Sequence, residues 1–201
     1  MRYKWVVGGG EYLEEVFQAW KQARPQQSVQ KVEVPQYAYH SFDLAVLDSL
    51  DAADGDMFIA FDERFGNFKR MELMQAAMAR GFKLEAFVHP NAVVGAGAVM
   101  GMNVYVGPQV VIGHGTRIDY NTVIHASVHI GAGAKIKSSC WVESGVQLGS
   151  AVELGAHCTI RTGALIRPHV KVGRGCELGW PGAYESDVPS KTVFDCRYDE
   201  P

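Results

Sequence analysis

The sequence lacks several features that would indicate a membrane or nucleic-acid-binding protein. It holds 22 acidic and 19 basic residues, a net charge of −3, so it has no excess of positive charge to attract nucleic acid or anionic lipid. No apolar run is long enough to span a bilayer. The opening residues MRYKWVV are followed at once by glycines and acidic residues, unlike a signal peptide. We therefore expect a cytoplasmic protein without membrane insertion or a nucleic-acid partner.

What the sequence does have is a six-residue repeat from Val88 to Glu177. These 90 residues divide into fifteen groups of six without an insertion. The first residue of every group is aliphatic or Met, and the fifth is Ala, Val, Thr or Cys. A period of six fits neither a helix nor an uninterrupted strand, so the chain must turn a corner once per group. We predict a β-solenoid with the first and fifth residues pointing inward.

Two other columns of the repeat carry information. Glycine at the second position is expected at corners, where a side chain would strain the backbone; the positions are Gly95, Gly101, Gly107, Gly113, Gly131, Gly149, Gly155 and Gly173. Cys140, Cys158 and Cys176 lie 18 residues apart. Since free cysteine behaves as a small buried hydrophobe, we expect a ladder of reduced thiols in the interior and not a metal or redox site.

The part before the repeat has the pattern of a small α/β domain. Residues 3–7 form an expected buried strand, Gly8 to Gly10 a tight turn, and residues 12–23 a helix with one apolar face. A second strand is expected over 56–61 and a second helix over 68–80, closed by Gly81. Strand, glycine turn and helix open a nucleotide-binding half-domain, where helix amides can hold phosphate. The region from Arg24 to Asp56 is weakly patterned.

The repeat resembles the hexapeptide-repeat left-handed β-helix of acyltransferases, in which three groups make one triangular coil. The fold class implied is an α/β N-terminal Rossmann-like half-domain followed by a left-handed parallel β-helix of about five coils. With the run Phe58 to Asp62, Arg64 at the entry of the next helix, and His89 to Ala92, the chain resembles the bacterial sugar acetyltransferases. That family includes the sialic-acid O-acetyltransferases and the nucleotide-4-amino-sugar N-acetyltransferases. The domains expected are 1–87, 88–178 and a closing loop and tail, 179–201.

This resemblance implies where the substrates bind. The N-terminal domain would hold a nucleotide sugar, with Gly8, Gly10, Asp62 and Arg64 as its candidate residues. Acetyl-CoA would lie along the later coils, between subunits of a homotrimer and near the backbone of Gly155 and Gly173. No metal is expected.

Acetyl transfer needs a base for the acceptor proton and donors for the oxyanion. His129 matches the family's second active-site histidine, whereas the position of the family's general base, nine residues earlier, is Tyr120. Periodicity offers a replacement, because His125, Glu143 and Arg161 are 18 residues apart and should be neighbours on successive coils. Glu143 could then accept the imidazole N–H and raise its basicity.

The sequence thus predicts an acetyl-CoA-dependent acetyltransferase acting on an amino or hydroxyl group of a sugar, probably nucleotide-linked, for surface glycan biosynthesis. Two alternatives remain open. The protein could be a non-catalytic trimeric binding or assembly protein, which the departures at Tyr120 and Ser186 favour. It could also be a metalloprotein like the solenoid carbonic anhydrases, although the histidine expected five residues after His114 is Asp119.

Overall fold

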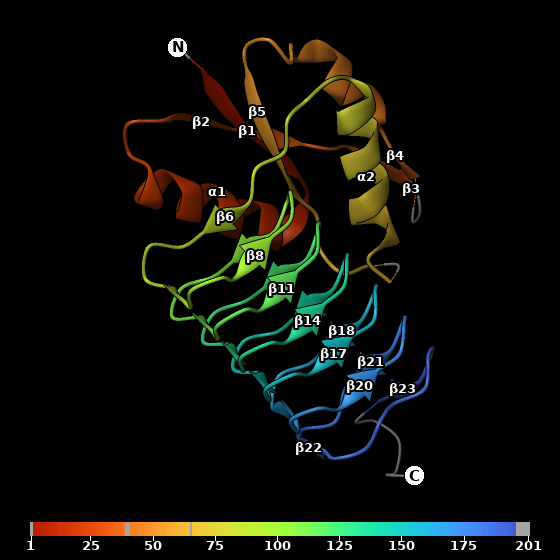
Figure 1. Ribbon diagram of the computed structural model, residues 1–201. Helices are drawn as coiled ribbons and strands as arrows, with labels where there is room; N and C mark the ends of the chain where they lie inside the picture. Colours follow the sequence, from red (N-terminus) through yellow and green to blue (C-terminus); the bar gives the residue numbers. More distant parts are fainter. Residues whose placement is uncertain (1, 39–40, 65, 196–201) are drawn as a thin grey trace. The chain divides into compact units, whose positions relative to one another are not determined.

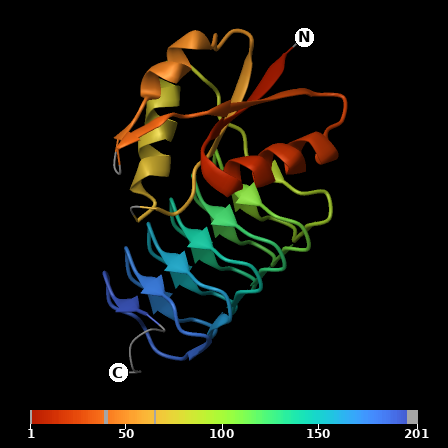
Figure 2. The same ribbon diagram turned by 180° about the vertical axis from the view of Figure 1, so that it is seen from behind.

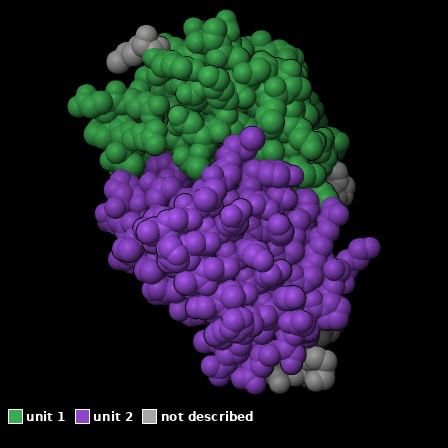
Figure 3. All heavy atoms as spheres, viewed as in Figure 1, with its two compact units in different colours: residues 1–86 green, residues 87–201 purple. Residues whose placement is uncertain are grey.

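The computed structural model describes residues 2–38, 41–64 and 66–195 (Figure 1). The chain divides into two compact units, Met1–Ala86 and Phe87–Pro201, coloured separately in Figure 3. Each unit has its own hydrophobic interior. The two units are described in turn.

The first unit is built on three parallel strands in the order β2 (Ser28–Glu33), β1 (Tyr3–Gly8), β5 (Gly55–Ala60). Its helices are α1 (Gly10–Ala23), α2 (Phe68–Ala79) and the 3-10 helix η1 (Leu44–Ser49). A short antiparallel pair, β3 (Gln36–Ala38) and β4 (Ser41–Phe42), follows β2. The strands and helices predicted from the glycine-turn pattern are confirmed, and the weakly patterned region supplies β2, β3, β4 and η1.

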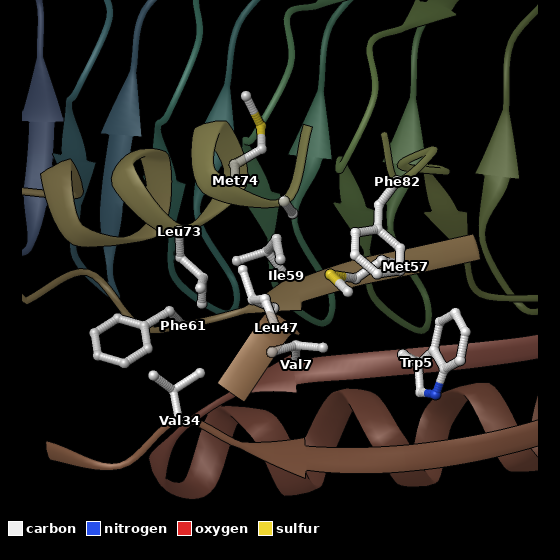
Figure 4. Close-up of a cluster of buried hydrophobic side chains, with 11 residues drawn as sticks. Trp5, Val7, Val34, Leu47, Met57, Ile59, Phe61, Leu73, Met74 and Phe82 are labelled. Atoms are coloured by element: carbon white, nitrogen blue, oxygen red, sulfur yellow. The ribbon is translucent and has the colours of Figure 1, made fainter. Parts of the chain in front are cut away.

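The sheet of the first unit has helices on both faces. Side chains of β1 and β5 alternate between the faces, as the strand period of two requires. On one face Val7 and Ile59 join an apolar cluster with Leu73 of α2 (Figure 4). On the other face Phe58 contacts Trp20 of α1, with ring centroids 5.4 Å apart. Burial on both faces explains why β1 and β5 are almost continuous apolar runs.

The second unit is a solenoid of very short parallel strands (Figure 2). Strands of successive coils pair in register 18 residues apart, as between Val111 and His129. The strands are β6 (Phe87–Val88), β7 (Val93–Val94), β8 (Val99–Met100), β9 (Tyr105–Val106), β10 (Val111–Ile112), β11 (Arg117–Ile118), β12 (Val123–Ile124), β13 (His129–Ile130), β14 (Lys135–Ile136), β15 (Trp141–Val142), β16 (Gln147–Leu148), β17 (Glu153–Leu154), β18 (Thr159–Ile160), β19 (Ala164–Ile166), β20 (Lys171–Val172), β21 (Glu177–Leu178), β22 (Gly182–Tyr184) and β23 (Val193–Phe194).

The interior of the solenoid follows the predicted columns. First-position residues from Val106 to Leu178 are buried, and so are fifth-position residues from Val104 to Cys176. Val88 and Val94 are 38% and 40% exposed because they belong to the first coil, which has no earlier coil against it. Polar fifth-position side chains are satisfied inside: Thr122 Oγ1, for instance, donates to the carbonyl of Lys137 at 3.0 Å. This explains how Thr and Cys are tolerated among Ala and Val.

The solenoid has about six coils and not the five that the repeat predicts. After Leu178 the hexapeptide pattern ends, but β22 pairs with β19 and β23 pairs with β21, both in parallel. Val188 also forms a parallel bridge with Val172. An irregular segment can add a coil because the edge of the last regular coil offers free backbone N–H and C=O groups whatever the side chains are. The fold is therefore a left-handed parallel β-helix of about six coils after an α/β unit.

The second-position glycines are required for a different reason from the one expected. A Cβ at Gly113 would lie 2.4 Å from the Ala132 backbone nitrogen on the next coil, so a side chain is excluded by close approach of the chain. The left-handed backbone conformation occurs instead at the fourth position. Gly115 adopts it with a φ of 67°, but Asn121 and Ser127 adopt it as well, with a φ of 60°.

Candidate active site

The four residues expected to bind the nucleotide sugar gather at the carboxyl ends of β1 and β5. Arg64 Nε donates to both carboxylate oxygens of Asp62 at 2.8 Å. A Cβ on Gly10 would be 3.7 Å from Arg64 Nη2 and 3.9 Å from Asp62 Oδ2, so the turn and this ion pair lie side by side. In open parallel sheets, this edge is where ligands bind.

The two glycines of this group have different roles. A Cβ on Gly8 would overlap the carbonyl oxygen of Ala60 at 1.7 Å, so Gly8 permits the close pairing of β1 with β5. Gly10 has a φ of 73° and begins α1. Gly9 caps this helix without a side-chain hydrogen bond. The first amides of α1 are therefore bare of side-chain caps, as a phosphate site needs, although Glu11 stands in the first turn.

The predicted column of His125, Glu143 and Arg161 exists in the solenoid. The backbone N–H of His125 donates to Val142 and that of Glu143 donates to Ile160, so the residues occupy equivalent places on successive coils. The His125 ring is half-buried and lies edge-on to Trp141, with centroids 4.4 Å apart and planes at 63°. The column thus places an imidazole against an aromatic wall.

Glu143 is engaged by the coil that follows it. Its Oε1 accepts from Arg161 Nη1 at 2.7 Å, and its Oε2 accepts from the backbone N–H and the hydroxyl of Thr162 at 2.9 and 3.2 Å. Burial acts to raise the pKa of Glu143, but the hydrogen bonds from Arg161 and Thr162 outweigh it and hold this pKa below its usual value. Glu143 is therefore ionised at neutral pH and bound to Arg161.

His129 and Tyr120 both lie on the outside of the solenoid. His129 is exposed on β13, and its Nδ1 lies 3.0 Å from Nε2 of Gln147, its neighbour 18 residues on. This contact orients the ring, because the amide nitrogen can only donate and Nδ1 must accept, leaving the proton on Nε2 of a neutral imidazole. Tyr120 is 41% exposed, and its backbone carbonyl accepts from Ser139.

The two glycines expected near coenzyme A line one cavity of about 470 Å³. Lys137, Lys171 and Ser190 also line it. The N–H of Gly155 donates to Val172 and that of Gly173 to Val188, so neither amide is available to a ligand. What the two glycines offer is a bare backbone surface between two lysines.

The cysteine ladder lies directly behind this surface. Cys140, Cys158 and Cys176 are free and buried. Cys140 Sγ donates to the carbonyl of Gly155 at 3.1 Å, and Cys158 Sγ donates to that of Gly173 at 3.0 Å. The thiols therefore hydrogen-bond the coils to one another, in agreement with the predicted structural role.

Several residues at these positions were not singled out from the sequence. Trp141 and Gln147 are the contacts of the two histidines, and Lys137 and Lys171 flank the glycine surface. Gln147 follows His129 by the 18-residue coil period, which would have revealed it. Trp141 lies on the strand paired with β12, next to His125 in space, and could be found by the same spacing.

The structure was also searched for features of the alternative classes. Over residues 2–38, 41–64 and 66–195, no three His, Cys, Asp or Glu side chains gather in a group that could hold a metal ion. Asp119, at the position of the missing histidine, forms an ion pair with Lys137 at 3.6 Å. No helix in the described part of the chain is both long and apolar enough to cross a bilayer.

Comparisons with known proteins agree with this architecture. A family model described as the GMPPB C-terminal domain matches residues 82–140, and comparison with curated protein sequences finds no match. The chain is similar to the acetyltransferase domain of PglB from Neisseria gonorrhoeae, with 22% identity, a TM-score of 0.86 and full coverage of both chains.

Two further solved structures are similar over nearly the whole chain. A variant of GDP-perosamine N-acetyltransferase from Caulobacter crescentus, in complex with CoA and GDP-perosamine, has 25% identity and a TM-score of 0.83, covering 96% of this chain and 93% of that one. WeeI from Acinetobacter baumannii has 16% identity and a TM-score of 0.75, covering 97% of each chain. The chain therefore has the fold of the hexapeptide-repeat, left-handed β-helix sugar acetyltransferases, in its α/β unit as well as in its solenoid.

Proposed function

We propose that this protein is an acetyl-CoA-dependent acetyltransferase that acts on an amino or hydroxyl group of a nucleotide-linked sugar, in the biosynthesis of a surface glycan. The observation that carries the proposal is the agreement in fold over 96% of the chain with an N-acetyltransferase that holds CoA and GDP-perosamine together. Both units of the chain are matched, so the likeness extends beyond the widespread solenoid to the unit proposed to bind the nucleotide.

The nucleotide sugar would bind at the carboxyl edge of the first unit. The uncapped amides at the start of α1 and the Arg64 guanidinium are both suited to a diphosphate, since one offers N–H donors and the other a positive charge. Gly10 leaves room beside them, because a Cβ there would meet no atom closer than 3.7 Å. Asp62 would orient Arg64 until the ligand arrives.

Acetyl-CoA would lie along the later coils. The backbone at Gly155 and Gly173 carries no side chain, so an extended pantetheine chain could approach it closely. Lys137 and Lys171 would attract the phosphates of the coenzyme. In the proposed assembly this surface faces a second subunit of a homotrimer, and sedimentation at micromolar concentration would test that state.

The chemistry would be a direct transfer. The acceptor nitrogen or oxygen attacks the thioester carbonyl carbon, a base removes the acceptor proton, the C–S bond breaks, and the thiolate of CoA leaves and takes up a proton. His125 is the proposed base and His129 the residue that positions or polarises the thioester through its Nε2–H. Glu143 would support His125 through the charge of the column, and Tyr120 would stand in as a hydrogen-bonding group at the family's usual base position.

The test is the release of free thiol. Acetyl-CoA would be incubated with a panel of nucleotide-linked amino sugars, UDP- and GDP-linked forms included, and CoA-SH would be measured together with the mass of the sugar product. Turnover with at least one acceptor, and a rise in melting temperature with CoA, are expected. No thiol release above background and no effect of CoA would reject the enzyme.

A non-catalytic binding protein is the second candidate, and one observation favours it. Glu143, proposed to support the base, has both carboxylate oxygens engaged by Arg161 and Thr162. A protein of this kind would bind a nucleotide sugar or CoA in calorimetry but release no thiol with any acceptor in the panel.

A further inference from the structure

The loop after β5 is held by a buried arginine that takes no part in the proposed site. Arg70, in the first turn of α2, is completely buried. Its Nη1 donates to the carbonyls of Phe61 and Asp62 at 3.2 and 3.1 Å. Its Nη2 donates to Oδ1 of Asn67 at 2.9 Å. One guanidinium thus binds the loop at both ends, with Asp62 and Arg64 between.

The partners of Arg70 explain why an arginine is needed there. Asn67 is itself buried and has a φ of 65°, a left-handed conformation at the helix start. Its N–H donates to Glu63 at 3.0 Å, which closes the loop on itself. Two nitrogens of a rigid planar fork must reach three oxygens from two directions. Lysine, with a single nitrogen on a flexible stem, cannot reproduce this arrangement.

The same bonds determine where Arg64 points. Arg70 binds the Asp62 backbone, the Asp62 side chain accepts from the backbone and side chain of Arg64, and the Arg64 side chain lies next to Gly10 at the start of α1. A displaced Asp62 would therefore move the Arg64 guanidinium away from the amides of α1. Since charge-assisted recognition of phosphate depends on this alignment, small displacements weaken binding.

We propose that Arg70 is a positioning residue that holds the Asp62–Arg64 pair beside the N-terminus of α1 and so sets the affinity of the first unit for the diphosphate of a nucleotide sugar. This inference rests on the proposed function for the identity of the ligand. Arg70 itself is buried and does not contact the ligand. Its effect reaches the nucleotide only, because the acetyl-CoA surface belongs to the solenoid.

The test compares Arg70→Met and Arg70→Lys with Arg80→Met. Arg80 follows the other end of α2, where it binds Asp48 and the carbonyl of Ala76, so the control removes an arginine without touching the loop. For both Arg70 variants we expect the KM for the nucleotide sugar to rise about tenfold, while kcat and the KM for acetyl-CoA stay within about twofold. Arg80→Met should change none of the three.

Asn67→Gly is a milder second variant in case loss of Arg70 prevents folding. Glycine accepts the left-handed backbone and removes only the side-chain acceptor of Arg70. It should raise the same KM by a smaller factor. Unchanged nucleotide-sugar KM in a folded Arg70 variant, or an equal rise in Arg80→Met, would overturn the inference and leave the acetyltransferase assignment intact.

The binding of GDP and UDP, measured by calorimetry, separates the two proposals. If the wild-type protein releases no thiol from acetyl-CoA, the proposed function fails, but weaker nucleotide binding by Arg70→Met than by Arg80→Met still supports the role of Arg70. Equal nucleotide affinity in these two variants and the wild type would reject that role.

Discussion

Arg161 Nη1 lies 2.7 Å from Glu143 Oε1, and Arg161 Nη2 lies 2.8 Å from Oε1 of Glu177. One guanidinium therefore joins carboxylates that come from the coil before it and from the next strand of the same sheet. The pair is partly shielded, with 31% of the Arg161 side chain and 25% of the Glu143 side chain exposed, so it contributes more than a fully solvated ion pair would. The column expected to serve catalysis thus also holds the later coils together.

Glu143→Gln should lower the melting temperature at neutral pH and have little effect in acid. The pKa of Glu143 lies below its ordinary value of 4.5 in the folded protein. Its stabilisation is therefore present above 4.5 and is lost as the pH falls through the lowered folded value. Thermal unfolding from pH 7 to pH 3 measures this. Glu185→Gln is the control, because Glu185 forms a longer, more exposed pair with Arg167 at 3.4 Å. A difference between Glu143→Gln and wild type that persists unchanged at pH 3 would contradict the assignment.

His125→Ala and His129→Ala should each reduce kcat by about 100-fold or more, as loss of a general base or of a polarising group does. The two effects should differ in pH dependence, because only loss of the base removes the acidic limb of the kcat/KM profile. Thiol release from acetyl-CoA is the measurement.

His114→Ala serves as the control for these variants. His114 is exposed and has no role in the proposed transfer, so near wild-type turnover is expected. Wild-type turnover in His125→Ala would remove that residue from the mechanism. Loss of turnover in His114→Ala, restored by zinc in the wild type only, would favour the metalloprotein alternative.

Gly131→Ala should destabilise the solenoid more than Gly133→Ala. A Cβ at Gly131 would lie 2.4 Å from the Ser150 backbone nitrogen, and neither backbone can move without displacing a coil. Gly133 has a φ of 69° but nothing within 4 Å of the added carbon, so its cost is torsional, about 1–2 kcal/mol. Urea unfolding compares the two, and equal stabilities would refute the close-approach explanation.

Cys158→Ser should be tolerated better than Cys158→Ala. Serine keeps a donor for the carbonyl of Gly173, as Thr122 does for Lys137 in the same column. Alanine leaves that carbonyl with one hydrogen bond fewer, at a cost of about 1 kcal/mol. Unfolding free energies measured under reducing conditions give the order. Greater stability of the alanine variant would show that the thiol acts only by packing.

The binding residues of the first unit could be predicted only in part. The pattern of strand, glycine turn and helix pointed to Gly8, Gly10, Asp62 and Arg64, and the structure brings these together at one edge of the sheet. Arg70 was not predicted, because an arginine in an amphipathic helix has the same pattern whether it is solvated or buried. Its role depends on where the carbonyls of Phe61 and Asp62 lie after folding.

The sequence by itself determined the solenoid, since a strict period of six with small and aliphatic columns can be buried only by turning a corner in every group. It also determined which residues are neighbours on successive coils, because those are 18 apart. Only the tertiary structure decided which neighbour Glu143 binds, why Gly113 must be glycine, and how the segment after Leu178 adds a further coil. These outcomes depend on side-chain rotamers and on backbone hydrogen bonds at a free edge, and neither of them leaves a periodic trace in the sequence.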